Sequence, residues 1–371
     1  MRLLILLLFI CNIAYSQEFY QIEDLSYVLT DVYIDNSSGD YYYTLQQGYL
    51  LENGDTIAHY PTWNASEMGL LSVCKWRGEI CVNVSGLDTA QHIICGADTI
   101  LSISYNTSPW NKLHRAGELV PTNDKLYIST GMGAVFTDPQ DTTNYRGKII
   151  SIDTNSNVKI EVLGLRNPWK FDYVEGKDLF FIGDVGWNDR EEINMCQPVS
   201  NMGWPCYEGT LPHNMYSCDT TIQFPIYEYE HTQSGVSITG GQFYDDVFYF
   251  TDLYTGEGGA LHPNGTIDTI QFPVQVTAMD IDSIMNSLIV VDFNGNVWSM
   301  SLDTLVLAID SIPVKPKPVW TPPRIVPFGW YVDCDGYVIL GTGVCHKDYD
   351  NPPLNTPMYD CRKFKKIIIL N

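Results

Sequence analysis

Short apolar runs separated by turn residues dominate the chain between Val28 and Leu305. The runs are rich in Tyr, Phe, Ile, Val and Thr and are broken by Gly, Asp and Asn, which is the pattern of β-strands joined by tight turns. Long stretches with the apolar period of an amphipathic helix are missing from this part of the sequence. The pattern therefore predicts an all-β fold.

A repeated phrase runs through these strands: an apolar segment that ends near Asp, a turn with Gly or Asn, and a second apolar segment. Its copies are Leu179–Asp184, Val247–Asp252 and Leu288–Trp298, with weaker ones at Tyr41–Leu51 and Leu126–Ile152. A period of roughly 40 to 50 residues is typical of propeller blades. We expect a six-bladed β-propeller with blades centred near residues 40, 80, 135, 185, 250 and 290. The alternative, a β-sandwich with coincidental turns, gives no reason for the period.

The segments outside the repeats suggest four regions. Residues 1–16 start with a charge, continue through an apolar run and end in small residues, the layout of a secretory signal peptide. A membrane anchor is the alternative, but the run is shorter than the ~20 residues of a membrane span. The propeller is expected over 17–311, with Glu18–Leu25 as the strand that closes its ring. Prolines predict an extended linker over 312–327, and 328–371 is expected to form a short, cysteine-containing C-terminal extension.

Charge narrows the choice of partner. The chain has 44 acidic and 21 basic residues, a net charge of −23, and no basic stripe. Such a surface would repel nucleic acid and anionic membranes, so a cation or a neutral ligand fits better. No later stretch has the length of a transmembrane segment, and the predicted signal indicates a secreted protein in an extracellular, periplasmic or cell-surface location.

The cysteines agree with an oxidising compartment. Removing the predicted signal takes away one of the ten cysteines and leaves an odd number, so at least one thiol lacks an intramolecular partner. Cys74 and Cys81 flank a tight turn and are predicted to face each other across a hairpin. Cys206 and Cys218 bracket a loop that they are expected to close, with Cys196 as a competing partner.

Three linked motifs give the chain a family resemblance. They are GLRNPWKF at 164–171, GDVGWNDREEIN at 183–194 and NMGWPCYEG at 201–209. In order and spacing they resemble the glucose/sorbosone dehydrogenase family, the soluble quinoprotein sugar dehydrogenases, and weaker similarity extends it over roughly residues 27–305. The family fold is a six-bladed propeller, which agrees with the blade count from the repeats.

The resemblance implies a cofactor and catalytic residues. The family holds pyrroloquinoline quinone (PQQ) with a calcium ion on the propeller axis and oxidises an aldose or related polyol by hydride transfer. His114 matches the general base, and Arg166 matches the arginine beside the quinone oxygens. Glu67 and Asn167 match positions near the cofactor. A purely structural role is the alternative for each: a packed histidine for His114, and a turn that ties a blade for Arg166 and Asn167.

The resemblance also implies a metal site. Gly186 and Trp187 match positions whose backbone carbonyls bind the calcium ion, an oxygen-only arrangement that suits a hard cation. Asp184 and Glu192 lie in the same loop region and resemble calcium ligands. The alternative is that these carboxylates cap neighbouring backbone N–H groups, the commoner role of acidic residues in blade turns.

Several residues depart from the family pattern. Arg115 and Ala116 interrupt the phrase after His114, Met132 replaces a common Asp, and Glu257 replaces a common Arg. A trianionic cofactor needs cations close to it, and the only candidates near the motifs are Arg115, Arg166 and Lys170. These departures, and an aromatic content of 13% suited to stacking on sugars, support a second hypothesis: a non-catalytic propeller that binds a glycan or a protein, as in hedgehog-interacting relatives. A third, an adhesin displayed through the tail, depends only on the C-terminal region.

Overall fold

The computed structural model describes residues 18–62, 66–88, 90–105, 113–213, 216, 218, 221–231 and 236–302, with the backbone of 330–332 and 338–340. The predicted signal peptide and linker lie outside the described residues, as do the three cysteines of the tail. The described part of the tail is one hairpin, β28 (Trp330–Val332) with β29 (Val338–Leu340).

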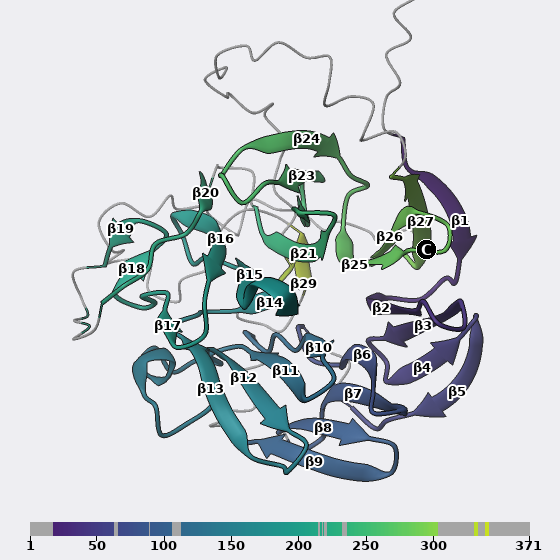
Figure 1. The fold of residues 1–371 in the computed structure, drawn as a ribbon, viewed down its shortest axis with the longest axis horizontal. Helices are drawn as coiled ribbons and strands as arrows, with labels where there is room; N and C mark the ends of the chain where they lie inside the picture. Colours follow the sequence, from purple (N-terminus) through teal and green to yellow (C-terminus); the bar gives the residue numbers. More distant parts are fainter. Residues whose placement is uncertain are drawn as a thin grey trace, which may run out of the picture.

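Six antiparallel sheets follow one another around a ring (Figure 1). Blade 1 contains β2 (Leu29–Asp35), β3 (Asp40–Leu45), β4 (Tyr49–Glu52) and β5 (Asp55–His59). Blade 2 contains β6 (Leu70–Trp76), β7 (Glu79–Ser85), β8 (Gln91–Cys95) and β9 (Asp98–Ile103). Blade 3 contains β10 (Leu119–Pro121), β11 (Lys125–Thr130), β12 (Lys148–Asp153) and β13 (Val158–Leu163), with the parallel strand β17 (Ser200–Asn201) at its edge.

The second half of the ring has the same plan. Blade 4 contains β14 (Pro168–Val174), β15 (Leu179–Asp184), β16 (Arg190–Cys196) and β20 (Tyr227–Glu230). Blade 5 contains β21 (Ile238–Tyr244), β22 (Val247–Asp252), β23 (Glu257–Leu261) and β24 (Ile267–Gln271). Blade 6 contains β25 (Val276–Asp282), β26 (Ser287–Asp292) and β27 (Asn296–Ser301). A separate hairpin joins β18 (Tyr207–Glu208) to β19 (Leu211–Pro212). The only helical elements among the described residues are two 3₁₀ turns, η1 (Asp138–Gln140) and η2 (Glu175–Lys177).

The N-terminal strand closes the ring. Strand β1 (Tyr20–Asp24) pairs antiparallel with β27 and becomes the fourth strand of blade 6. Segments from both ends of the propeller thus share one sheet, which leaves neither the first nor the last blade with an unfilled edge. The predicted six-bladed, all-β architecture and the closing strand are confirmed.

The core is divided into six apolar clusters, and each cluster lies between two consecutive blades. Strand β15 shows why: Phe180 belongs to the cluster between blades 3 and 4, while its neighbour Phe181 belongs to the cluster between blades 4 and 5. Successive side chains of a strand point to opposite faces. Because both faces of a blade are covered, the strands appear in sequence as continuous apolar runs rather than alternating ones.

The Asp that ends the repeated phrase stabilises the adjoining turn. Asp292 at the end of β26 accepts hydrogen bonds from the backbone N–H groups of Asn294 and Asn296 at 2.8 and 3.0 Å. Asp252 at the end of β22 does the same for Tyr254 and Thr255, both at 2.9 Å. The repeat in the sequence is therefore a repeat of capped turns.

The disulfide prediction is half right. Cys206 and Cys218 form a disulfide, as expected, and Cys196 is a buried free thiol. The predicted Cys74–Cys81 pair is wrong: Cys81 is bonded to Cys95, and Cys74 is free and buried. Cys81 lies on the middle strand β7, directly opposite Cys74 on β6 and also opposite Cys95 on β8. The spacing of the β6–β7 hairpin predicts that Cys74 lies opposite Cys81, but it gives no information on Cys95 in the next strand.

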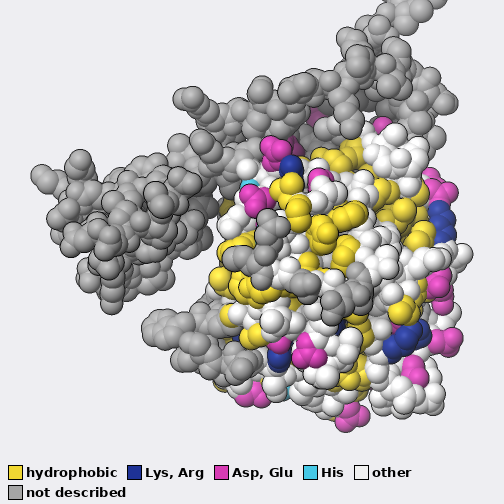
Figure 2. Space-filling model, turned by 90° about the vertical axis from the view of Figure 1, so that its left-hand side faces the viewer, with side chains coloured by type: hydrophobic (Ala, Val, Ile, Leu, Met, Phe, Trp, Pro, Cys, Tyr) yellow, Lys and Arg dark blue, Asp and Glu magenta, His cyan; other side chains and the backbone are white. Residues whose placement is uncertain are grey.

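One side of the propeller carries a broad hydrophobic area. Figure 2 shows this side, on which β18 and β19 lie, with acidic side chains around the yellow area. Within the described ranges, no helix has the length and apolar character of a membrane span.

Candidate functional site

His114 and Arg166 are in direct contact. Arg166 Nη2 donates to His114 Nε2 over 2.8 Å, and His114 Nδ1 lies 2.8 Å from the carbonyl oxygen of Gly133. A carbonyl only accepts, so Nδ1 carries the ring proton and Nε2 carries the lone pair. Burial and the charge of Arg166 hold the pKa of His114 below its ordinary value. The imidazole is therefore a neutral base beside a fixed cation.

The backbone around His114 is held in an uncommon conformation. His114 has a φ of 55° and Ala116 a φ of 34°, the left-handed region that non-glycine residues rarely adopt. The N–H of Gly133 donates to the His114 carbonyl over 3.0 Å, and a Cβ on Gly131 would lie 2.0 Å from that carbonyl oxygen. The glycines of the segment after β11 are needed for this close approach, which fixes the imidazole against blade 3.

Glu67 and Asn167 connect the same segment to the turn before β14. Glu67 Oε2 accepts from Asn167 Nδ2 at 3.1 Å and from the Arg115 N–H at 3.2 Å. Asn167 Oδ1 accepts from the Ala116 N–H at 3.1 Å. The fold therefore brings Glu67 and Asn167 together with the His114 segment. These hydrogen bonds join the two side chains to each other and to backbone groups of the protein.

One buried nitrogen of Arg166 has no hydrogen-bond partner among the described residues. Its Nη1 donates to the Val185 carbonyl over 2.8 Å, and the guanidinium lies 5.7 Å from the ring centre of Trp204. Its Nε is buried and receives no hydrogen-bond partner from the described residues. Because a buried unpaired donor is costly, this atom is a place where an acceptor from a ligand would be stabilised.

Asp184 uses both carboxylate oxygens on the backbone. They accept from the N–H groups of Arg166 at 2.9 Å and Asn167 at 2.7 Å. Glu192 lies opposite Asp184 across β15 and β16, and its Oε1 accepts from Asn194 Nδ2 at 3.2 Å. Burial raises the pKa of Asp184 to about 7 and that of Glu192 well above its usual range. Asp184 therefore has the contacts of a capping residue, the alternative weighed from the sequence, whereas the Glu192 contact is to a side-chain amide.

The loop of Gly186 and Trp187 is closed by two buried glutamates. Glu191 Oε2 accepts from the Gly186 N–H at 3.2 Å, and Glu208 Oε1 accepts from the Trp187 N–H at 2.6 Å. A Cβ on Gly186 would lie 1.6 Å from the Arg190 carbonyl oxygen, so only glycine fits. No backbone N–H of the described residues outside the strand ladders donates to the carbonyls of Gly186 and Trp187.

The other two expected cations are engaged elsewhere. Arg115 is 1% exposed, and its guanidinium lies 3.9 Å from the ring centre of Tyr105. Lys170 Nζ contacts Asp31 Oδ1 at 2.5 Å and also Glu118. This buried triad joins segments of blades 1, 3 and 4. Of the three cations counted in the sequence, Arg166 is the one that the structure shows donating a hydrogen bond to the His114 ring.

Two departures from the family pattern have structural explanations. Met132, which replaces the common Asp, is buried, and its sulfur accepts a hydrogen bond from Trp204 Nε1 at 3.1 Å. The indole N–H therefore has an acceptor although the carboxylate is missing. Glu257 is partly buried, and burial and the charge of Asp252 raise its pKa. Neither side chain provides a positive charge for an anionic ligand.

An aromatic cluster that sequence reasoning missed lies beside Arg166. Phe136 has ring centres of three partners within 6 Å: Trp187 at 5.3 Å, Trp204 at 5.7 Å and Tyr216 at 5.9 Å. Trp187 is 38% exposed. The signal was present, since Trp187 and Trp204 belong to the quoted motifs, but Phe136 and Tyr216 come from unrelated loops. Exposed aromatic faces next to polar groups suit a sugar or a flat ring.

Comparison with known proteins confirms the family resemblance. Residues 87–249 match the family model described as Glucose / Sorbosone dehydrogenase. Two curated relatives from Arabidopsis thaliana are similar: the HIPL2 protein, 28% identical over 39% of this chain, and the HIPL1 protein, 26% identical over 38%. Each match covers 28% of the relative, so this chain spans less than a third of their length.

Solved structures agree on the fold. A putative oxidoreductase (glucose dehydrogenase) from Thermus thermophilus is similar with a TM-score of 0.64 and 16% identity, over 76% of this chain and 99% of that one. The PQQ-bound aldose sugar dehydrogenase of Streptomyces coelicolor gives 0.63 and 15%, over 76% and 98%. The apo form of the Escherichia coli enzyme gives 0.61 and 15%, over 76% and 98%. At these identities the likeness shows the propeller fold alone.

Proposed function

From the family match and the shared fold, we propose that this propeller oxidises a hydroxyl group of an aldose or related polyol, with PQQ as the hydride acceptor and calcium as its companion ion. The observation that carries the proposal is the 2.8 Å hydrogen bond from Arg166 Nη2 to His114 Nε2. It joins a neutral base to a fixed positive charge. Oxidation of a hydroxyl needs both, because a proton leaves the oxygen and negative charge develops nearby.

His114 acts as the general base. Its Nδ1 proton is held by the Gly133 carbonyl, so Nε2 is the atom that takes the hydroxyl proton once the substrate hydroxyl replaces the Arg166 N–H at this nitrogen. The lowered pKa keeps the ring neutral near pH 7, and a neutral ring is ready to accept. Arg166 stabilises the alkoxide character of the oxygen as the proton leaves. Trp187 and Phe136 provide apolar surface against which a sugar ring can pack.

The residues at this end of the site fit the cofactor. When bound, PQQ supplies the carbonyl that accepts hydride, and calcium polarises that carbonyl. Arg166 Nε, buried and without a partner among the described residues, would hold a quinone oxygen. The carbonyls of Gly186 and Trp187 would hold the calcium ion, whereas Asp184 is occupied by backbone N–H groups.

A second candidate function follows from the positions of the cations. Arg115 stacks on Tyr105, and Lys170 is enclosed by two carboxylates, so the charges that would hold the carboxylates of PQQ are engaged within the protein. This arrangement favours a non-catalytic propeller that binds a glycan or a protein. The hydrophobic area of Figure 2 offers such a partner a surface.

We also propose that the protein is secreted. Two disulfides, Cys81–Cys95 and Cys206–Cys218, are features of proteins that fold in an oxidising compartment. The predicted signal peptide at residues 1–16 agrees with this proposal.

An absorption experiment decides between the two candidates. The chain from Gln17 onward is mixed with PQQ and calcium, and the spectrum is recorded before and after addition of each member of a panel of aldoses, with an artificial dye as final acceptor. A dehydrogenase retains the quinone through gel filtration and reduces the dye with at least one sugar. Failure to retain the quinone, or retention without sugar-dependent reduction, supports the binding propeller instead.

A further inference from the structure

Three potential metal ligands gather beside the Gly186–Trp187 loop. They are Asp189 in the loop after β15, Glu208 in β18 and His213 just after β19. One ligand atom from each lies within 4.8 Å of the other two. None of the three was expected to bind a ligand, and none belongs to the contacts of His114 and Arg166.

Glu208 presents an unpartnered oxygen to this cluster. Its Oε1 accepts four backbone N–H groups, at 2.6 to 3.1 Å, from Trp187, Asn188, Asp189 and Arg190. The residue is 3% exposed, yet its Oε2 receives no hydrogen bond from the described residues. Although burial opposes ionisation, the four N–H groups bring the pKa of Glu208 below its usual value. A buried carboxylate thus directs a free oxygen at its neighbours.

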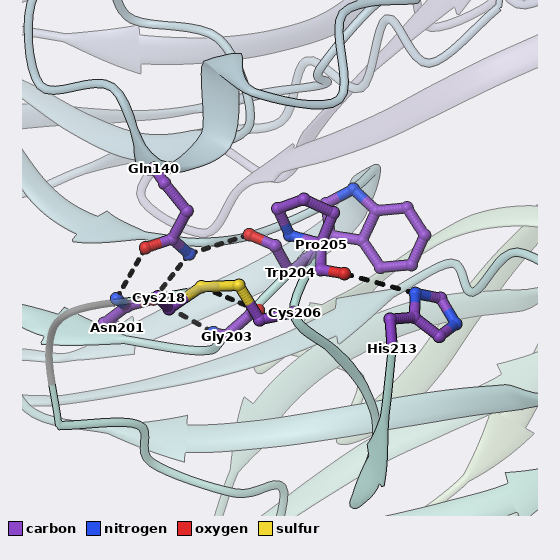
Figure 3. The surroundings of a disulfide bond; sticks show 8 residues. All are labelled: Gln140, Asn201, Gly203, Trp204, Pro205, Cys206, His213 and Cys218. Carbon is purple, nitrogen blue, oxygen red and sulfur yellow. Dashed lines mark hydrogen bonds between the residues drawn. A yellow bond between two sulfur atoms is a disulfide. The ribbon is translucent and has the colours of Figure 1, made fainter. Parts of the chain in front are cut away.

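His213 faces that oxygen with a lone pair. Figure 3 shows its Nδ1 bonded to the Pro205 carbonyl, at 3.2 Å. The proton of a neutral ring is therefore on Nδ1, which leaves Nε2 as an acceptor. Nε2 lies 3.2 Å from Glu208 Oε2. Two acceptors at this separation repel each other unless a proton or a metal cation lies between them. A backbone carbonyl on the far nitrogen is the usual support of a metal-binding histidine.

The separation fits one tetrahedral ion. Two ligands at ~2.0 to 2.1 Å from tetrahedral zinc lie ~3.3 to 3.4 Å apart, close to the 3.2 Å between His213 Nε2 and Glu208 Oε2. Asp189 is exposed at the end of the cluster and is free to adjust as the third ligand. The fourth position would face solvent.

The surroundings keep His213 in place. The Cys206–Cys218 disulfide (Figure 3) closes the loop that carries it. The β18–β19 hairpin lies within that loop. The rings of Trp187 and Trp204 pack against the imidazole, with centres 5.8 and 5.3 Å away. Ligands on an element fixed in this way form a preorganised site.

We propose that Asp189, Glu208 and His213 bind a divalent transition metal ion of the zinc type. One imidazole and two carboxylates suit zinc, whereas calcium prefers an all-oxygen set. The site is next to the proposed calcium site, to which Glu208 is joined through the Trp187 N–H, but metal binding at it does not depend on PQQ or calcium. It stabilises the Gly186–Trp187 loop, whose Trp187 N–H donates to Glu208.

The test uses the mature chain without an affinity tag, stripped with a chelator and without PQQ. Zinc is titrated by calorimetry, and cobalt is added as a spectroscopic probe. We expect one equivalent of zinc, a tetrahedral cobalt absorption band, and quenching of tryptophan fluorescence by cobalt because two indoles flank His213. The variants His213→Gln and Asp189→Asn should each weaken zinc binding by ~10-fold or more.

The matched control is His262→Gln, which removes another histidine paired with a carboxylate, Asp268 at 2.8 Å, and should leave zinc binding unchanged. Circular dichroism confirms that each variant is folded. Absence of stoichiometric zinc binding to the wild type, or equal binding by His213→Gln, overturns the proposal. So does an NMR titration in which His213 stays doubly protonated in saturating zinc, because the contact would then be a plain ion pair.

Discussion

Arg166 Nη2 lies 2.8 Å from His114 Nε2, although the two residues are 52 positions apart in the chain. His114 lies in the segment that enters β10, and Arg166 lies in the turn between blades 3 and 4. The contact fixes the tautomer of the histidine and keeps a positive charge next to its basic nitrogen. It is the one point at which the residues assigned to catalysis from the motifs touch each other.

Replacing the base tests the proposed chemistry. His114→Gln keeps an acceptor for the Arg166 N–H but cannot take up a proton. We expect quinone binding to be nearly unchanged and sugar-dependent dye reduction to fall by ~10²- to 10⁴-fold. Single-turnover reduction of bound quinone measures the chemical step. Arg166→Ala is the contrasting variant: it should weaken quinone binding itself. Equal activity of wild type and His114→Gln would exclude His114 as the base.

The pH profile tests the charges around His114. Its pKa is lowered by burial and by Arg166, and the negative charge of Glu67 opposes this shift. The neutral form is active, so kcat/KM should fall as pH drops through the lowered pKa. Arg166→Met removes a positive charge and should move this acid limb to higher pH. Glu67→Gln removes a negative charge and should move it to lower pH. Shifts in the same direction would show that the limb belongs to another group.

Much of the fold could be predicted because each blade is formed by strands that are consecutive in the sequence. Each blade is a run of adjacent strands, and the Asp292 and Asp252 caps repeat the same short-range contact. The closing strand β1 was also predictable, because a ring of this kind leaves one sheet incomplete. These features depend on residues that are close together in the sequence, and for that reason the sequence pattern indicates them.

The site could be predicted only in part, because its details depend on which partners meet across blades. Nothing in the sequence indicates that Lys170 is enclosed by Asp31 and Glu118 from other blades. Cys81 lies between Cys74 on one flanking strand and Cys95 on the other. The pattern of a single hairpin does not indicate which of the two forms the disulfide. The contact of Asp189, in the loop after β15, with Glu208 and His213, in the Cys206–Cys218 loop, is likewise a meeting of two segments that the sequence pattern does not relate.

The buried triad predicts a large effect on stability. Lys170→Met would leave Asp31 and Glu118 buried without a counter-charge, which costs ~3 to 5 kcal/mol of unfolding free energy. Guanidinium chloride unfolding measures it. Lys177→Met is the control, because its partner Asp246 is on the surface, with a side chain 76% exposed, and it should change little. Similar effects of the two variants would contradict the structural role of the triad.

The same variant should respond to pH in a defined direction. Burial is the main cause that raises the pKa of Glu118 to about 8, and the charge of Lys170 opposes the rise. Removing that charge raises the pKa further. When a carboxyl has a higher pKa in the folded state than in the unfolded state, the free energy of unfolding of the protein falls as pH rises above the unfolded pKa, until the pH reaches the folded pKa. Below pH 8 Glu118 is protonated in both proteins, so the stability gap between Lys170→Met and wild type should stay constant there and widen as pH rises above about 8, where only wild-type Glu118 ionises. A gap that narrows would mean that Glu118 is not the group affected.

Two truncations test where the propeller ends. Strand β1 fills the open edge of blade 6 through its pairing with β27, so deletion of residues 18–24 should expose that edge and lower the Tm, by ~2 to 4 °C for each kcal/mol lost, with aggregation on heating. Deletion from Ile312 onward removes the predicted linker and tail and should leave the Tm unchanged, since few contacts cross such a boundary. Calorimetry of both shortened chains and the full chain compares them. A drop in Tm on removal of the tail as large as that on removal of β1 would mean that the C-terminal region is part of the ring, and the boundary at 312 would then be wrong.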